Sequence, residues 1–112
     1  MYYAYLLLLL FAGHALCDYP LQGDFLSKAK NHKSPIPGVP FWQALTAHSL
    51  IHMGMVLLIT NSIELAIAEF IVHWVTDYSK CGGLISYNQD QFIHYFSKVL
   101  WISILYTAVR HG

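Results

Sequence analysis

Pairs of histidine and aspartate recur along this chain at a spacing that suits metal binding. Four apolar segments each carry two such residues four positions apart, and in a helix these side chains share one face, about 5–6 Å from each other. The pairs are His14 with Asp18, His48 with His52, His73 with Asp77, and Asp90 with His94. Imidazole and carboxylate ligands together suit a divalent transition metal, with Zn²⁺ as the first candidate. We therefore predict that these residues bind one or two metal ions.

The positions of the pairs in their segments place them at one depth. Asp77 ends the third segment and Asp90 begins the fourth, while His48 lies 13 residues before Asn61 and His73 lies 12 residues after it. Ionisable groups inside membrane helices are costly and usually face the bundle interior at a functional site. A purely structural hydrogen-bonded network is the alternative interpretation of the same pattern.

The composition indicates the class of protein that must position these pairs. The chain has 112 residues, of which 56% are hydrophobic and 11% charged, and its formal net charge is zero. A disordered chain would need low hydrophobicity and high net charge, and a nucleic-acid-binding protein would need an excess of basic residues. The composition therefore excludes both classes. It favours an integral membrane protein, because a soluble domain of this size could not bury so much apolar surface.

The apolar segments predict an all-α fold, a polytopic membrane bundle of four transmembrane helices in a single domain over residues 1–112. The expected helices cover residues 2–18, 41–60, 62–77 and 91–109, near the short end of what a hydrocarbon core of about 30 Å requires. Asn61 and Ser62 predict a tight turn between the second and third helices. The HxxxD motifs of the first and third helices suggest a tandem two-helix repeat. A cleaved signal peptide is the alternative for the first segment, although no positive charge precedes the apolar run.

Four lysines indicate the orientation in the membrane. Lys28, Lys30 and Lys33 lie in the first connection and Lys80 in the third, and these connections share one side of a four-helix arrangement. The positive-inside rule places that side in the cytoplasm and both termini on the non-cytoplasmic side. The metal site is then expected near the cytoplasmic face, where the lysines could attract an anionic head group.

Two further charges are expected deeper in the membrane. Glu69 precedes His73 by four residues and Lys98 follows His94 by four, so each shares a helix face with a metal-binding pair. The two helices run in opposite directions, and each charge lies about 12 Å deeper than the aspartate of its helix. A buried unpaired charge is strongly unfavourable, so we predict an ion pair between Glu69 and Lys98.

The motifs that contain these pairs resemble those of a protein family. They are His14-x-x-x-Asp18-x-x-x-Gln22-x-Asp24, His48-x-x-x-His52, His73-x-x-x-Asp77-x-x-Lys80 and Asp90-Gln91-x-x-His94. Over about residues 6–105 the chain resembles a family of small bacterial and phage membrane proteins of unknown function. That family is distantly similar to metal-dependent hydrolases of the bacterial inner membrane, and it usually has glycine where this chain has Cys17. The resemblance implies that Gln22 and Asp24 join the site.

These observations together lead us to expect a metal-dependent hydrolase of the bacterial inner membrane that acts on a lipid or lipid-linked substrate. The expected catalytic residues are Glu69 and Asp24, and the residues expected to support the metal or contact the substrate are Gln22, Gln91, Lys80 and Lys98. Nucleic acid is not an expected partner, and the sequence leaves a homo-oligomer open. The alternative is a non-enzymatic membrane protein for assembly, ion movement or modification of a host envelope, whose cluster is structural or binds haem.

Overall fold

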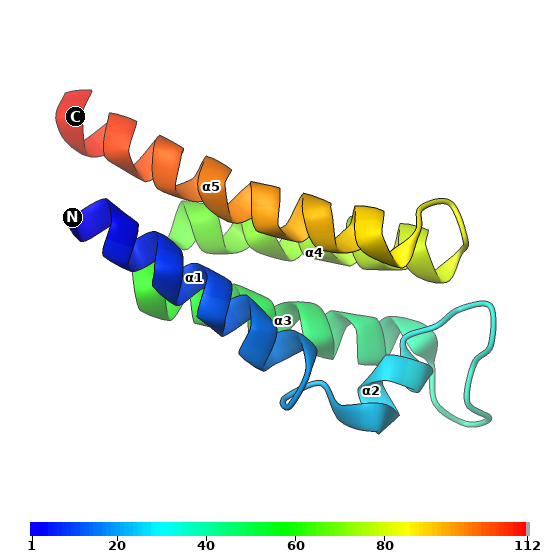
Figure 1. Cartoon of the computed structure of the whole chain (residues 1–112). Helices are drawn as coiled ribbons and strands as arrows, with labels where there is room; N and C mark the ends of the chain where they lie inside the picture. Colours follow the sequence, from blue (N-terminus) through cyan, green and yellow to red (C-terminus); the bar gives the residue numbers. More distant parts are fainter. Residues whose placement is uncertain (112) are drawn as a thin grey trace.

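The chain folds into four long helices and one short helix. The computed structural model describes residues 1–111, with side chains up to Val109. The helices are α1 (Tyr2–Asp18), α2 (Gly23–Ala29), α3 (Phe41–Thr60), α4 (Ile63–Cys81) and α5 (Tyr87–His111). The four long helices run antiparallel in an elongated bundle with extents of 49 × 23 × 22 Å (Figure 1). The all-α class predicted from the sequence is confirmed.

The bundle is closed in a ring of four helices. α1 packs against α3 and α5, and α4 packs against the same two helices. Both chain ends and the short α3–α4 turn lie at one end of the bundle, while α2 and the two longer connections lie at the other (Figure 1). The helix ends that carry His14–Asp18 and His73–Asp77 therefore point to the same end as α2, which we call the α2 end.

The α3–α4 turn forms where the sequence predicted it. Asn61 adopts a left-handed conformation with φ of 56°, which ends α3. The Ser62 hydroxyl then accepts a hydrogen bond from the Leu65 backbone N–H at 3.2 Å and caps the start of α4. Two residues thus reverse the chain and hold α3 and α4 side by side.

Three features differ from the expected helix boundaries. α4 continues past Asp77 to Cys81, and α5 begins at Tyr87 rather than Gln91. The earlier start of α5 follows from a capping box, in which the Ser86 hydroxyl accepts from the Gln89 N–H at 3.1 Å and the Gln89 side chain accepts from the Ser86 N–H at 2.9 Å. The third difference is α2, which occupies part of the connection over residues 19–40 and is bent by 80° from α1.

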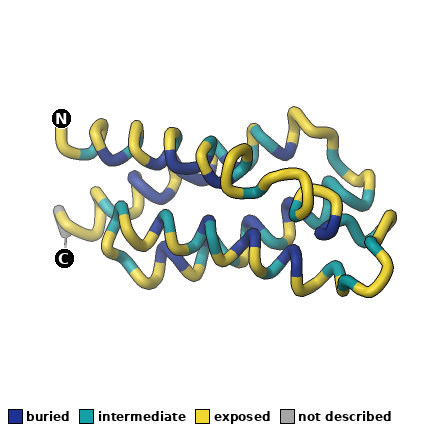
Figure 2. The backbone as a smooth tube through the Cα atoms, turned by 90° about the horizontal axis from the view of Figure 1, so that it is seen from below, coloured by how far each residue is buried: buried dark blue, intermediate teal, exposed yellow. Residues whose placement is uncertain are grey.

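The interior is apolar at one end of the bundle and polar at the other. The apolar core lies at the end with the chain termini and consists of Leu6, Leu10, Val56, Leu65, Trp101 and Ile102. Buried histidines and carboxylates fill the α2 end, and large apolar side chains are exposed along the outer faces of the long helices. Figure 2 shows that buried segments of the long helices face the bundle axis and exposed segments face outward. A polar interior with an apolar exterior is typical of a membrane protein.

Length and composition test the expected membrane spans. α3 and residues 87–109 of α5 are long and apolar enough to cross a membrane, and α1 with α2 would add a third span if the bent pair counts as one. α4 is one residue shorter than α3, and it carries four charged residues, Glu64, Glu69, Asp77 and Lys80. The structure thus supports two or three spans on this basis, and the predicted four spans and tandem repeat stay predictions.

Candidate metal centre

The four predicted pairs meet inside the α2 end of the bundle. His14 and Asp18 occupy the last two turns of α1, His48 and His52 the first half of α3, His73 and Asp77 the second half of α4, and Asp90 and His94 the first two turns of α5. Seven of the eight side chains are buried, and that of Asp18 is 9% exposed. The antiparallel helices bring these positions to one level because α1 and α4 end there while α3 and α5 begin there.

Asp18 is the centre of the first part of the cluster. The Nε2 atoms of His48 and His52 lie 3.2 and 3.0 Å from Asp18 Oδ1. The other oxygen, Oδ2, lies 3.2 Å from His14 Nε2 and accepts a hydrogen bond from the Gln91 amide at 2.9 Å. One carboxylate at the end of α1 therefore binds together side chains from α1, α3 and α5.

Asp77 connects the first part of the cluster to the second. Its Oδ2 lies 3.5 Å from both His48 Nε2 and His73 Nε2, and its Oδ1 lies 4.0 Å from His94 Nε2. His94 Nε2 is also 3.1 Å from Asp90 Oδ1. The carboxylate of Asp77 thus presents Oδ2 to His48 and His73 and Oδ1 to His94. All five histidines direct Nε2 towards a carboxylate.

The imidazole rings of three helices form a continuous stack. The rings of His52 and His73 have centroids 3.7 Å apart, and those of His73 and His94 are 4.2 Å apart. His73 is therefore the middle ring, between α3 and α5. Its Nε2 is buried and has no hydrogen-bond partner in the described part of the chain.

The donor atoms are close enough together to hold metal ions. Three groups have one ligand atom per residue within 4.8 Å of every other, namely Asp18, His48, His52 and His73; Glu69, His73 and His94; and Asp77, Asp90 and His94. A buried polar nitrogen without a partner costs free energy, and coordination would satisfy the His73 Nε2 lone pair. The residues present therefore fit a metal of the borderline type that imidazole and carboxylate ligands select.

The ion pair predicted from helix depth is confirmed. Lys98 Nζ lies 2.7 Å from Glu69 Oε1, and both side chains are buried. Trp101 Nε1 donates to the same oxygen at 3.0 Å, while Glu69 Oε2 lies 3.4 Å from His73 Nδ1. Glu69 therefore contacts the side of the His73 ring opposite Asp77. In this position Glu69 can orient the His73 ring. The catalytic role expected for Glu69 from the sequence stays a prediction.

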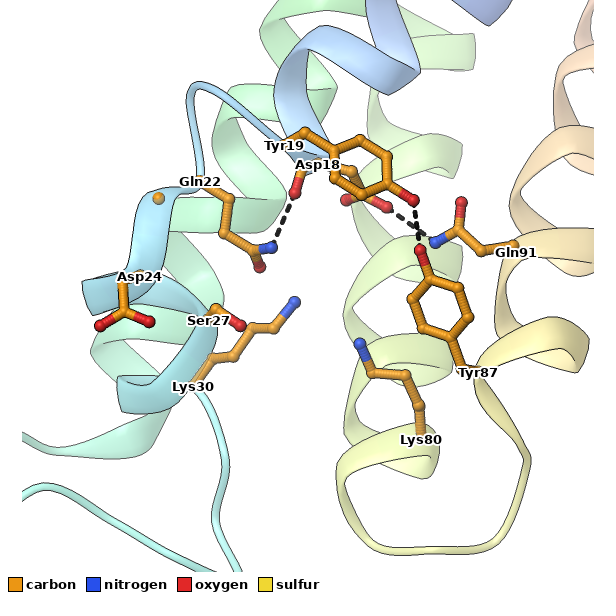
Figure 3. Close-up of a pocket in the computed structure, with 10 residues that line it drawn as sticks. Asp18, Tyr19, Gln22, Asp24, Ser27, Lys30, Lys80, Tyr87 and Gln91 are labelled. Atoms are coloured by element: carbon orange, nitrogen blue, oxygen red, sulfur yellow. Dashed lines mark hydrogen bonds between the residues drawn. The ribbon is translucent and has the colours of Figure 1, made fainter.

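A polar cavity opens beside the cluster at the α2 end. Its volume is about 500 Å³ and it is lined by residues of α1, α2, α4 and α5 and the turn between α1 and α2 (Figure 3). The lining side chains include the expected Gln22, Lys80 and Gln91 together with Asp18 of the cluster. The Gln22 amide donates to the Asp18 backbone carbonyl at 2.8 Å, and the hydroxyls of Tyr19 and Tyr87 form a hydrogen bond across the cavity (Figure 3).

Asp24 lines the cavity and lies outside the buried cluster. Its side chain is 82% exposed and pairs with Lys28 of the same helix at 3.0 Å. The reason is the bend before α2, which turns Asp24 to the outer rim of the cavity while Lys30 points inward (Figure 3). Asp24 therefore lies on the cavity side of the site, and its expected catalytic role stays a prediction.

Lys30 lies inside the buried cluster, a position that the sequence analysis did not assign to it. Its ammonium lies 2.6 Å from Asp77 Oδ2, and its side chain is 3% exposed. Nothing in the sequence separates Lys30 from Lys28 and Lys33, because all three lie in one polar connection. The Tyr19–Tyr87 contact is likewise a product of the bend after α1, which no local pattern encodes.

Comparison with known proteins gives one match. Residues 6–111 match the profile of a family described as "Protein of unknown function (DUF3307)". No curated protein and no solved structure matches the chain.

Proposed function

Because the chain belongs to this family of proteins of unknown function (DUF3307), we propose its function from the site: it is a membrane-embedded metal-dependent hydrolase. The observation that carries the proposal is the convergence of five histidine Nε2 atoms on the carboxylates of Asp18, Asp77 and Asp90, with His73 Nε2 left without a hydrogen-bond partner among the described residues. A structural network would be expected to pair its buried polar atoms. The proposal accounts for the unpaired nitrogen as an open ligand.

Two ions account for the cluster better than one. Asp18, His48, His52 and His73 would hold the first ion, and Asp77, Asp90 and His94 the second. The Asp77 carboxylate, with one oxygen towards each group, would connect them. The second group has only three protein ligands, which leaves a position for water or substrate. Zinc suits both groups, since their ligands are imidazole and carboxylate.

The chemistry we propose is hydrolysis at the cavity wall. A metal held by these residues would supply a nucleophilic water at neutral pH and a positive charge for the oxygen of the group under attack. Asp18 and Gln91 line both the cluster and the cavity, so they would orient a substrate group that enters from the cavity. Glu69 would hold the His73 ring so that Nε2 faces the metal.

We propose further that α4 also crosses the membrane, giving four spans. Its charged residues Glu69 and Asp77 are buried, whereas Ile63, Ile67, Ile71 and Val75 follow one face and are each more than half exposed. Such a stripe suits contact with lipid, and the polar face suits the bundle interior. The lysines at the α2 end support an orientation with that end in the cytoplasm. A site at that depth favours a lipid or lipid-linked substrate whose head group reaches the interface.

A non-enzymatic structural cluster is the second candidate. The ion pairs of Lys30 with Asp77 and of Lys98 with Glu69 favour it, because they neutralise two buried carboxylates without any metal. Haem is disfavoured, because Asp18 Oδ1 lies within 3.2 Å of the Nε2 atoms of both His48 and His52, where haem iron would bind.

Elemental analysis of the detergent-purified protein distinguishes these functions. We expect close to two equivalents of zinc or another transition metal in the wild type and a clear loss in His52→Ala. His32→Ala is the matched control, since His32 stacks on Tyr78 outside the cluster. A wild-type protein that takes up no metal, and whose stability a chelator leaves unchanged, would favour the structural cluster. A Soret absorption band would favour haem.

A further inference from the structure

The cavity at the α2 end is lined by the kind of side chains that bind anions, but its lysines already lie next to a carboxylate of the protein. Its lining carries two lysines, Lys30 and Lys80, and two aspartates, Asp18 and Asp24. Both lysines lie close to the carboxylate of Asp77, with Nζ–O distances of 2.6 and 3.7 Å. Asp77 therefore holds the Lys30 ammonium directly, and its negative charge also attracts the ammonium of Lys80.

Lys30 occupies an oxygen that the metal would use. Asp77 Oδ2 lies 2.6 Å from Lys30 Nζ and 3.5 Å from the Nε2 atoms of His48 and His73. A divalent ion bound to that oxygen and an ammonium in contact with it would repel each other strongly in a buried site. Binding of metal at Asp77 Oδ2 would therefore displace the Lys30 ammonium, and the cavity is the open space that its side chain already lines.

The element that carries Lys30 can accommodate such a movement. α2 has seven residues, and it packs on α3. A turn links α1 to Gly23, the first residue of α2, which has φ of 65°. The Lys30 side chain also has four rotatable bonds, so the ammonium can leave Asp77 without unfolding the helix.

Metal binding would also change the charge of the cavity. Ions held by Asp18, Asp77 and Asp90 neutralise the carboxylates that now attract Lys30 and Lys80. The two ammonium groups then face the cavity with the hydroxyls of Tyr19 and Tyr87 and the amide of Gln91 (Figure 3). Two cations with several neutral donors beside a two-metal centre match a phosphoryl group, which carries up to two negative charges.

We propose, on the basis of the metal centre proposed above, that the cavity binds a phosphoryl group and that Lys30 moves from Asp77 to that group when metal binds. In the metal-free protein Lys30 is the counter-ion of Asp77. In the loaded protein it is a substrate-binding residue. The same ligand chemistry belongs to free phosphate and to the head group of a phospholipid, and a cavity of about 500 Å³ has room for a head group.

The test measures metal and phosphate binding in the detergent-purified full chain. The variants are Lys30→Met and, as the matched control, Lys28→Met, which removes an exposed lysine of the same helix. We expect the zinc-loaded wild type to bind inorganic phosphate and the metal-free protein to bind at least about tenfold more weakly. Lys30→Met should lower phosphate affinity by about tenfold or more while zinc binds at least as tightly as in the wild type, because a competing cation is gone. Lys28→Met should match the wild type in both measurements.

The outcomes separate this inference from the proposed function. Equal phosphate affinity with and without zinc, or in wild type and Lys30→Met, overturns the phosphoryl site while the metal centre stands. Weaker zinc binding in Lys30→Met overturns the proposed movement of Lys30 away from Asp77, because Lys30 would then support the metal site. A wild type that binds no zinc overturns both proposals.

Comparing phosphatidic acid with phosphatidylcholine in mixed micelles, against inorganic phosphate, identifies the source of the phosphoryl group. Tighter binding of phosphatidic acid than of inorganic phosphate indicates a lipid head group, and equal affinities indicate free phosphate.

Discussion

The ammonium of Lys98 lies 2.7 Å from the carboxylate of Glu69, and both groups are buried between α4 and α5. The pair also reaches the cluster, since Glu69 Oε2 lies 3.4 Å from His73 Nδ1. Lys98 in addition donates to the His94 backbone carbonyl at 3.2 Å. One ion pair therefore supports a histidine on each of two helices from the side of the apolar core.

Breaking this pair on one side should destabilise the protein more than removing it. Lys98→Met leaves Glu69 as a buried unpaired carboxylate, and such changes cost about 3–5 kcal/mol. The double change Glu69→Gln with Lys98→Met leaves no charge, and the glutamine oxygen can still accept from Trp101. We expect its free energy of unfolding to lie closer to the wild type than that of Lys98→Met. Denaturant unfolding in detergent measures both, and destabilisation by the double change equal to the sum of the single changes would contradict the coupling.

The same double variant tests whether Glu69 orients His73. Groups that hold a metal-binding histidine from behind typically contribute about 10–100-fold to metal affinity. We therefore expect Glu69→Gln with Lys98→Met to fold but to bind zinc about 10–100-fold more weakly than the wild type. Isothermal titration with zinc measures this loss. Unchanged zinc affinity in the folded double variant would show that Glu69 has only a structural role.

The helices and the cluster could be predicted because both depend on local spacing. Residues four apart share a helix face wherever the helix lies, so His73 and Asp77 necessarily lie on the same face of their helix. The Glu69–Lys98 contact followed from counting residues along two antiparallel helices. These relationships need only the helical repeat and the two-residue turn at Asn61, and no knowledge of how the bundle packs.

The features that escaped prediction depend on how the chain bends between helices. Asp24 and Lys30 lie six residues apart in α2 and its C-cap, yet one is exposed and the other buried because α2 turns 80° from α1. No spacing rule gives that angle. The start of α5 was predictable in principle, since Ser86 and Gln89 form a capping box that the sequence displays.

The two metal groups should respond separately to substitution. Asp18→Asn removes the carboxylate of the group with His48 and His52, and Asp90→Asn that of the group with His94. We expect each variant to retain about one of the two ions, and the combined variant to retain neither. Elemental analysis with circular dichroism measures metal content and helix content on the same sample. Loss of both ions in each single variant would contradict independent groups and indicate a single shared centre.

Removal of metal should destabilise the protein, and less so in acid than at neutral pH. A ligand that binds only the folded state at a hundred times its Kd stabilises that state by about 2.7 kcal/mol. A chelator should therefore lower the unfolding midpoint of the wild type. Imidazole binds metal only when it is deprotonated, so protons compete with the ion and the metal-dependent part of the stability should shrink as pH falls.

Thermal unfolding at neutral and acidic pH, with zinc and with chelator, measures this difference. His52→Ala should show a smaller gap between the zinc and chelator curves, while His32→Ala should keep the wild-type gap because His32 lies against Tyr78 and Phe41 outside the cluster. A wild-type gap that stays the same at both pH values would mean that zinc binds through carboxylates without the histidines. A gap of equal size in His52→Ala and the wild type would remove His52 from the ligand set.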